Sequence, residues 1–281
     1  MTALAARRSN GLVPYLTLFG LIVLLLIMLS PFAIVVVNAF KAPQEYAANG
    51  PISLPSGIYT QGLADFWNRV DFTTKLVNST VISLSVAVLG VCLSLLNAFA
   101  LGIGRVRGRV WFLVFFMIAN TLPHESLAYP LYYFAKFFKI YDTQFAVILI
   151  FTVIQSAFGT YLLSSVFSTF PREMVEAATV DGCNKLQLLF RVVAPISLPS
   201  LSVLFVFFFI WTWNEFFLPL IMLISNGKQT VPLAIATLQG QHNMDATTTS
   251  ASALLGILPC IIFFFLFQRT LTRGITAGSI K

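Results

Sequence analysis

Six long apolar runs constrain this chain more than any other feature of its sequence. A helix needs about 20 mostly apolar residues to cross the hydrocarbon core of a bilayer, and an open strand there would leave backbone groups unpaired. We therefore expect an all-α integral membrane protein with six transmembrane helices. The expected spans are, in chain order, residues 12–38, 77–101, 110–130, 143–167, 200–224 and 250–268.

The composition favours the same class. Of the 281 residues, 58% are hydrophobic and only 10% are charged, whereas a soluble domain carries about 25% charged residues. The net charge of +7 does not indicate nucleic-acid binding, because the basic residues are scattered through short loops. The first apolar run is also longer than the apolar region of a signal peptide, which spans roughly 7–15 residues. We expect a single transmembrane domain over residues 1–281, embedded in the lipid bilayer.

The basic residues between the runs predict how the chain crosses the membrane, because cytoplasmic loops carry an excess of Lys and Arg. With the N-terminus inside, 11 of the 17 basic residues fall on the cytoplasmic side. They are Arg7, Arg8, Arg105, Arg107, Arg109, Arg172, Lys185, Arg191, Arg269, Arg273 and Lys281. We therefore expect a multi-pass protein of the plasma (inner) membrane with both termini cytoplasmic. The arginines between the second and third spans are expected to meet lipid headgroups.

The segment between the fourth and fifth runs, residues 169–199, has local structure of its own. Pro171 suits the first helical position, and Glu173 lies in the first turn, where the helix dipole favours an acid. Asp181 and Gly182 form a turn signal that should end this helix. From these residues alone, a helix lying on the membrane surface is as good an interpretation as a docking element.

One pattern in this segment resembles the EAA loop of permease subunits in ATP-binding-cassette importers: Glu176-Ala177-Ala178, Asp181-Gly182, Pro195 and Pro199. Three further stretches resemble the carbohydrate permeases of the maltose, lactose and glycerol-phosphate type. They are "NSTVISL" from Asn78, "WNEFFLPL" from Trp213 and the tail "FQRTLTRGITAGSIK". The resemblance implies the type I importer permease fold, with a cytoplasmic coupling helix between the fourth and fifth spans.

The resemblance also implies a function, as one transmembrane subunit of an ATP-driven, binding-protein-dependent sugar importer. The implied partners are a second permease subunit, two ATPase subunits and an extracellular solute-binding protein, with a sugar as substrate. The implied contact with the ATPase lies at Glu176, Ala177, Ala178, Asp181 and Gly182. The sequence has no Walker A pattern, no nucleophile–base constellation and no set of metal ligands. We therefore expect no enzyme activity and no cofactor in this chain, with ATP and Mg on the partner ATPase subunit.

Acids within or close to membrane spans are costly enough to be functional candidates. Glu215, together with Trp213 and Asn214, is a candidate for the translocation path. Aromatic faces stack on sugar rings, and amide and carboxylate groups form hydrogen bonds with hydroxyls. Alternatively, Glu215 pairs with a neighbouring helix and holds a subunit interface. His124 and Glu125 lie near the end of the third expected span, where both can be solvated.

Two other functions stay open. An ion-coupled secondary transporter is expected to show inverted repeats and broken helices at matching positions, and neither is visible in the sequence. A non-transporting membrane scaffold subunit would share the same loop and the same spans. The sequence does not name the sugar, and residues 41–60 carry no pattern that predicts a role.

Overall fold

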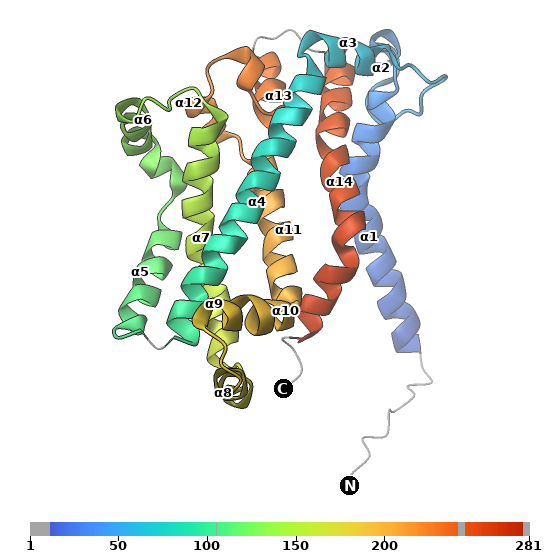
Figure 1. The fold of residues 1–281 in the computed structure, drawn as a ribbon. Helices are drawn as coiled ribbons and strands as arrows, with labels where there is room; N and C mark the ends of the chain where they lie inside the picture. Colours follow the sequence, from blue (N-terminus) through green and yellow to red (C-terminus); the bar gives the residue numbers. More distant parts are fainter. Residues whose placement is uncertain (1–11, 105, 241–244, 278–281) are drawn as a thin grey trace. The chain divides into compact units, whose positions relative to one another are not determined.

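The computed structural model describes residues 12–104, 106–240 and 245–277, and the elements in these ranges are all helical (Figure 1). Of the basic residues that predict the orientation, Arg7, Arg8, Arg105 and Lys281 lie outside these ranges. The chain divides into two compact units. Unit 1 comprises Met1–Phe66 with Gln241–Leu255, and unit 2 comprises Trp67–Gly240 with Gly256–Lys281.

Unit 1 contains α1 (Leu12–Ala39), α2 (Pro43–Asn49), most of α3 (Gln61–Arg69) and the start of α14 (Ala246–Ala277). Residues 12–34 of α1 are apolar on every side of the helix and all exposed, which is typical of a membrane span. The loop after α1 is ordered by a fully buried lysine, Lys41, whose Nζ donates to Gly50 O at 3.0 Å and to Ser53 Oγ at 3.2 Å. This loop was the stretch without a sequence pattern.

The core of unit 2 is formed by α4 (Phe72–Gly102), α7 (Gln144–Ser168) and α11 (Leu198–Asn214), which pack against one another. Small residues let the helix axes approach closely. A Cβ at Gly159 of α7 would lie 2.2 Å from Ser94 Oγ of α4, closer than atoms can approach. Glycine at this position is therefore a requirement of the packing.

The remaining elements of unit 2 are short helices and turns. They are α5 (Arg109–Thr121), η1 (His124–Leu127), α6 (Ala128–Phe137), α8 (Arg172–Val180), α9 (Lys185–Leu188), the π-helical turn η2 (Leu189–Val193), α10 (Ala194–Ile196), α12 (Phe217–Met222), η3 (Asn226–Lys228) and α13 (Val231–Gly240). In Figure 1, α8, α9 and α10 lie at the end of α4 opposite to α6, α12 and α13.

Four described helices are long and apolar enough to cross a membrane: α1, α4, α7 and α14. The two other apolar regions are bent, by 93° between α5 and the segment His124–Phe137, and by 80° between Lys185–Ile196 and α11. Counting each bent pair as one span gives six. The expected class, an all-α protein of the membrane, is confirmed.

The expected spans 110–130 and 200–224 both contain breaks. The helix α5 ends at Thr121 and is about 20 Å long, shorter than the roughly 30 Å hydrocarbon core. Pro123 follows it and cannot donate the next backbone hydrogen bond of a helix. In the second case the helix stops at Asn214 and resumes at Phe217. The sequence did not reveal these two breaks, so the lack of visible broken helices in the sequence is no argument against an ion-coupled transporter.

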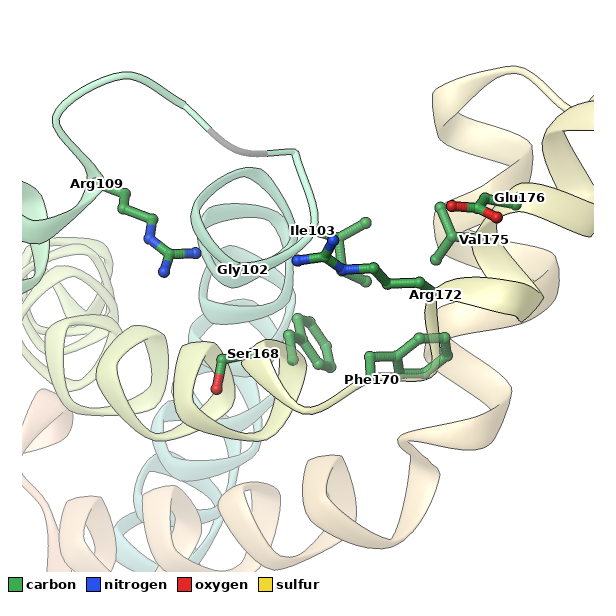
Figure 2. A pocket seen from close by; sticks show the side chains of 9 residues that line it. Gly102, Ile103, Arg109, Ser168, Phe170, Arg172, Val175 and Glu176 are labelled. Atoms are coloured by element: carbon green, nitrogen blue, oxygen red, sulfur yellow. The ribbon is translucent and has the colours of Figure 1, made fainter.

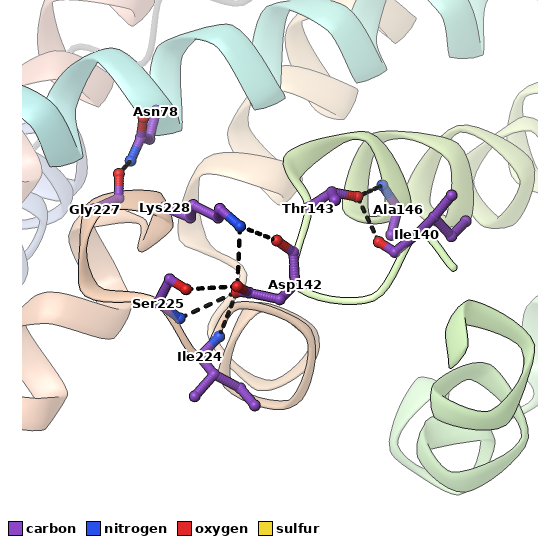
Figure 3. A network of polar contacts seen from close by, with 9 residues as sticks. All are labelled: Asn78, Ile140, Asp142, Thr143, Ala146, Ile224, Ser225, Gly227 and Lys228. Atoms are coloured by element: carbon purple, nitrogen blue, oxygen red, sulfur yellow. Dashed lines mark hydrogen bonds and ion pairs between the residues drawn. The ribbon is translucent and has the colours of Figure 1, made fainter. Parts of the chain in front are cut away.

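The segment that follows α12, residues 224–231, is held to α4 and to the residues just before α7 (Figure 3). The side chains that hold it are Lys75, Asn78, Ser79, Asp142 and Lys228, which we call the polar clamp. On the α7 side, the Asp142 carboxylate accepts hydrogen bonds from the backbone N–H groups of Ile224 and Ser225, each at 3.0 Å. It also accepts one from Ser225 Oγ at 2.5 Å and forms an ion pair with Lys228 at 2.9 Å. A single carboxylate thus organises four donors.

The α4 side of the clamp is more deeply buried. Lys75, only 1% exposed, donates to both the backbone carbonyl and the side-chain oxygen of Asn226. Asn78 Nδ2 donates to Gly227 O at 2.9 Å, and Ser79 Oγ accepts from Val231 N at 2.9 Å. The "NSTVISL" stretch therefore supplies two clamp residues, which fix the start of α13.

Candidate functional site

A pocket of about 310 Å³ lies in unit 2 beside the end of α11. It is lined by His124, Phe151, Gln155, Ile210, Trp211, Asn214 and Glu215. Apolar and aromatic walls that carry a few polar groups are typical of small-molecule sites. The bend after α5 brings His124 to this pocket, and the break after α11 brings Glu215 there. Both breaks therefore shape the same site.

Glu215 has a structural role that the sequence did not reveal. Its backbone is extended (φ −71°, ψ 129°), which ends α11. Its Oε1 accepts hydrogen bonds from the backbone N–H groups of Phe217 at 3.1 Å and Leu218 at 3.4 Å. These amides open α12, where a helix favours a negative charge. The carboxylate is thus stabilised by a helix N-terminus, and within the described residues no cation pairs with it.

The structure separates Trp213 from the two residues that follow it. Trp213 is 2% exposed, stacks on Phe209 and donates from Nε1 to Gly256 O of α14 at 3.3 Å. It does not line the pocket, whereas Asn214 and Glu215 do. Asn214 is fixed by a hydrogen bond from its Nδ2 to Ile210 O at 2.8 Å. The roles of all three in a translocation path stay predictions.

The sequence reasoning did not identify Gln155 as a residue of this pocket. Gln155 Nε2 donates to Thr212 Oγ1 at 2.9 Å. Its Oε1 is buried and has no hydrogen-bond partner within the described residues. An unpaired buried acceptor is costly, so it favours a ligand that can donate a hydrogen bond. The signal available in the sequence was a glutamine inside an otherwise apolar run.

The second region of interest is the loop of residues 171–196, which we call the α8 loop. The helix α8 ends at Asp181, and Gly182 has φ +82°, so the expected turn is confirmed. After the turn, Asn184 and Gln187 form a reciprocal capping box at the start of α9. The loop is therefore compact through its own local hydrogen bonds.

Most of the residues with an implied ATPase contact lie on the surface of the α8 loop. Glu176, Ala177, Asp181 and Gly182 are exposed, but Ala178 is only 7% exposed. The carbonyl of Ala178 accepts a hydrogen bond from Cys183 N at 3.0 Å. Ala178 therefore supports the fold of the loop and is less suited to touch a partner. The loop also exposes five large apolar side chains: Met174, Val180, Leu186, Phe190 and Ile196.

A helical membrane core, a polar pocket at a broken helix and a separate structured loop define a transporter subunit. The chain belongs to the family of binding-protein-dependent transport system inner membrane components, whose model matches residues 90–277. It is 31% identical over 264 residues to the inner membrane ABC transporter permease protein YcjP of Escherichia coli, covering 93% of this chain and 94% of that protein.

Further comparisons agree. The chain is 29% identical to the probable starch degradation products transport system permease protein AmyC of Thermoanaerobacterium thermosulfurigenes, covering 95% of this chain and 97% of the relative. It is 26% identical to the arabinooligosaccharides transport system permease protein AraQ of Halalkalibacterium halodurans, covering 98% and 99%. The fold matches a chain in the crystal structure of a bacterial ABC transporter involved in the import of the acidic polysaccharide alginate. That match has a TM-score of 0.78 and 21% identity, and covers 93% of this chain and 97% of the other.

These findings confirm the expected family and the type I permease fold. The chain is a multi-pass inner-membrane permease component of an importer, which is consistent with the expectation that it is not itself an enzyme. Family membership does not favour the ion-coupled or scaffold alternatives.

Proposed function

We propose that this chain is the permease subunit of a sugar importer and forms half of its translocation path beside a second permease subunit. The observation that carries the proposal is the pocket at the end of α11, because it combines an aromatic wall with a few hydrogen-bonding side chains. The substrates for which related permeases are named support the substrate class: starch degradation products, arabinooligosaccharides and diacetylchitobiose.

The chemistry of the pocket suits a neutral polyhydroxylated molecule. Trp211 offers an aromatic face for a sugar ring, Gln155 Oε1 offers an acceptor, and Asn214 offers an amide. The Glu215 charge already interacts with the N-terminus of α12, so the pocket demands no cationic partner. A few such groups recognise hydroxyls without binding them so tightly that release would be slow. We assign Trp213 to holding the end of α11 against α14, outside the path.

The same proposal gives the α8 loop its role. It docks on the cytoplasmic side to one of two ATPase subunits, which hold ATP and Mg, through Glu176, Ala177, Asp181 and Gly182. Both termini are then cytoplasmic, and an extracellular binding protein delivers the sugar on the opposite side. Closure of the ATPase pair moves the loop, and the coupling is reciprocal, so a loaded binding protein favours the closed ATPase.

One strain tests both halves of the proposal: a deletion of this chain complemented by variants, with uptake of labelled neutral oligosaccharides and co-purification of the ATPase as readouts. We expect Asn214→Leu to lower uptake about tenfold while ATPase retention stays normal, because only the pocket loses a polar group. We expect Glu176→Ala to lower ATPase affinity about tenfold. Glu173→Ala is the matched control, an exposed acid on the same helix outside the implied contact.

The two variants separate the claims. Normal uptake with Asn214→Leu removes the pocket from the path, and normal ATPase retention with Glu176→Ala removes the docking role of the α8 loop. A proton uncoupler should leave uptake intact, whereas an inactive partner ATPase should abolish it. The opposite pattern would replace the importer by an ion-coupled carrier.

A further inference from the structure

Two arginines from different helices share one pocket beside the α8 loop. The pocket has a volume of about 300 Å³ and is lined by Gly102, Ile103, Arg109, Phe167, Ser168, Phe170, Arg172, Val175 and Glu176. Arg109 opens α5 and Arg172 opens α8. Figure 2 shows both guanidinium groups extending toward the end of α4 that lies between them. The site therefore joins the membrane core to the α8 loop.

Neither guanidinium is neutralised within the described residues. Glu176 lines the same pocket but forms no ion pair with Arg109 or Arg172, and neither guanidinium forms a hydrogen bond with a described residue. Two positive groups facing one hollow repel each other. The guanidinium fork matches the oxygens of a phosphate and forms paired charge-assisted hydrogen bonds with it. An anion seated between the arginines would turn repulsion into two favourable contacts.

The surroundings of Arg109 indicate where that anion comes from. The residues that follow it on α5 are apolar and exposed: Val110 by 61%, Trp111 by 78% and Phe115 by 64%. A second, apolar pocket of about 460 Å³ is lined by Trp111, Phe112, Phe115 and Phe116. Exposed Trp and Phe next to Arg mark the boundary between headgroups and hydrocarbon. The two pockets thus offer one place for a charged group and another for an acyl chain.

We propose that Arg109 and Arg172 bind a phosphate group, and that an anionic phospholipid supplies it, with its chain against the aromatic residues of α5. The bound headgroup bridges α5 and α8 and holds the α8 loop against the end of the membrane core. Free phosphate esters share the chemistry of the headgroup but make no use of the apolar pocket. The site uses charges of this chain only, so the proposal does not depend on which sugar is carried.

The test compares lipids on the purified importer complex by native mass spectrometry, with phosphatidylglycerol and phosphatidylcholine added in equal amounts. We expect the wild type to retain phosphatidylglycerol preferentially. The double variant R109Q/R172Q should lose that preference by at least about tenfold. The matched control R107Q/R191Q removes two exposed arginines that do not line the pocket and should keep the preference. The pair R109K/R172K, with charge but without the planar fork, should keep only part of it.

A second arm identifies the source of the phosphate. Sodium phosphate is compared with sodium chloride at equal ionic strength, as a competitor for retained phosphatidylglycerol. If sodium phosphate displaces phosphatidylglycerol only when Arg109 and Arg172 are present, the phosphate site is supported. Its ligand would then be a phosphate from solution instead of a lipid. Retention that resists phosphate supports the lipid. Equal loss of preference in R109Q/R172Q and in the control pair, or no loss in either, would overturn the proposal.

Discussion

The two ends of unit 2 are built on different principles. At one end the polar clamp fixes residues 224–231 through side chains of α4, including the buried Lys75, and through the carboxylate of Asp142 just before α7. At the other end the α8 loop is closed by its own capping box and turn, and α8 packs mainly against α9. Most charged groups of the clamp are satisfied within the chain, whereas those of the α8 loop are exposed.

This difference indicates which interactions stabilise each end. Groups satisfied within the chain contribute to the folding free energy, so changing them should destabilise the chain itself. Exposed groups contribute little to folding, and their effect appears only when a partner or a lipid binds. The same substitution made once at each end therefore tests whether the two ends differ in this way.

The largest effect is expected for the two lysines, Lys75 and Lys185. Lys75→Met removes the buried cation that donates two part-buried hydrogen bonds to Asn226, so the free energy of unfolding should fall by about 3 kcal/mol. Lys185 is exposed, and Lys185→Met should change it by less than about 0.5 kcal/mol. Unfolding of the purified chain in mixed detergent measures both. Equal effects at the two positions would contradict the proposed division between the ends.

A smaller effect is expected for the aspartates. Asp142→Asn should lower the free energy of unfolding by about 2 kcal/mol, because hydrogen bonds to a charged group are lost or weakened. Asp181 is exposed and its side chain has no partner within the described residues, so Asp181→Asn should be close to neutral. Thermal unfolding in detergent compares them, and a destabilised Asp181→Asn would show that the α8 loop is also held by its charges.

The Asp142 prediction also has a pH signature. The hydroxyl of Ser225 donates to the carboxylate, and together with the Ser225 amide and Lys228 it holds the pKa of Asp142 well below its usual range. A lowered pKa in the folded state adds stability above the unfolded pKa of about 3.9, and this stability is lost as pH falls. The difference between wild type and Asp142→Asn should stay constant from neutral pH to about pH 5 and narrow below about pH 4. A difference that is independent of pH would exclude the charge as its cause.

The sequence predicted the four unbroken spans because long apolar runs leave a helix no alternative in lipid. It did not predict the break at Glu215, although the contacts of the Glu215 carboxylate with the amides of Phe217 and Leu218 are local. The carboxylate caps α12, and no local pattern separates this from an acid facing a partner. Likewise, nothing in the sequence marks Lys41 and Lys75 as buried, although tertiary contacts bury both. Hydropathy finds the spans but does not tell which polar residues fold back onto them.

The candidate site was predicted in part for the same reason. Asn214 and Glu215 could be found as polar residues in an apolar run, and they do line the pocket. Trp213 lies beside them in the sequence but points to α14, because neighbours on a helix differ in direction by about 100°. Gln155 and His124 come from other elements, so only the fold brings them to the pocket. The turn at Gly182 was predicted correctly because its cause is local.

The smallest effect, and the sharpest test of the α8 loop, is expected at Gly182. Its φ of +82° is a conformation that costs an ordinary L-residue about 1–2 kcal/mol, while Asn adopts it more readily. No atom lies within 4 Å of the place where a Cβ would be, so crowding inside this chain is not the obstacle. Gly182→Ala should therefore weaken ATPase retention about fivefold through the strained turn, whereas Gly182→Asn should stay near the wild type.

The free energy of unfolding should fall by at most about 1–2 kcal/mol in Gly182→Ala, which is the cost of the strained turn, and by less in Gly182→Asn. Co-purification of the ATPase then separates two reasons for a glycine. If Asn restores retention, the backbone conformation is what the partner needs, and the α8 loop acts as a preformed surface. If Asn fails as Ala does, the empty space beside Gly182 is itself filled by the partner. Normal ATPase retention by Gly182→Ala would mean that neither the turn conformation nor the space beside it matters for docking. The proposal that the α8 loop is shaped for docking would then be wrong.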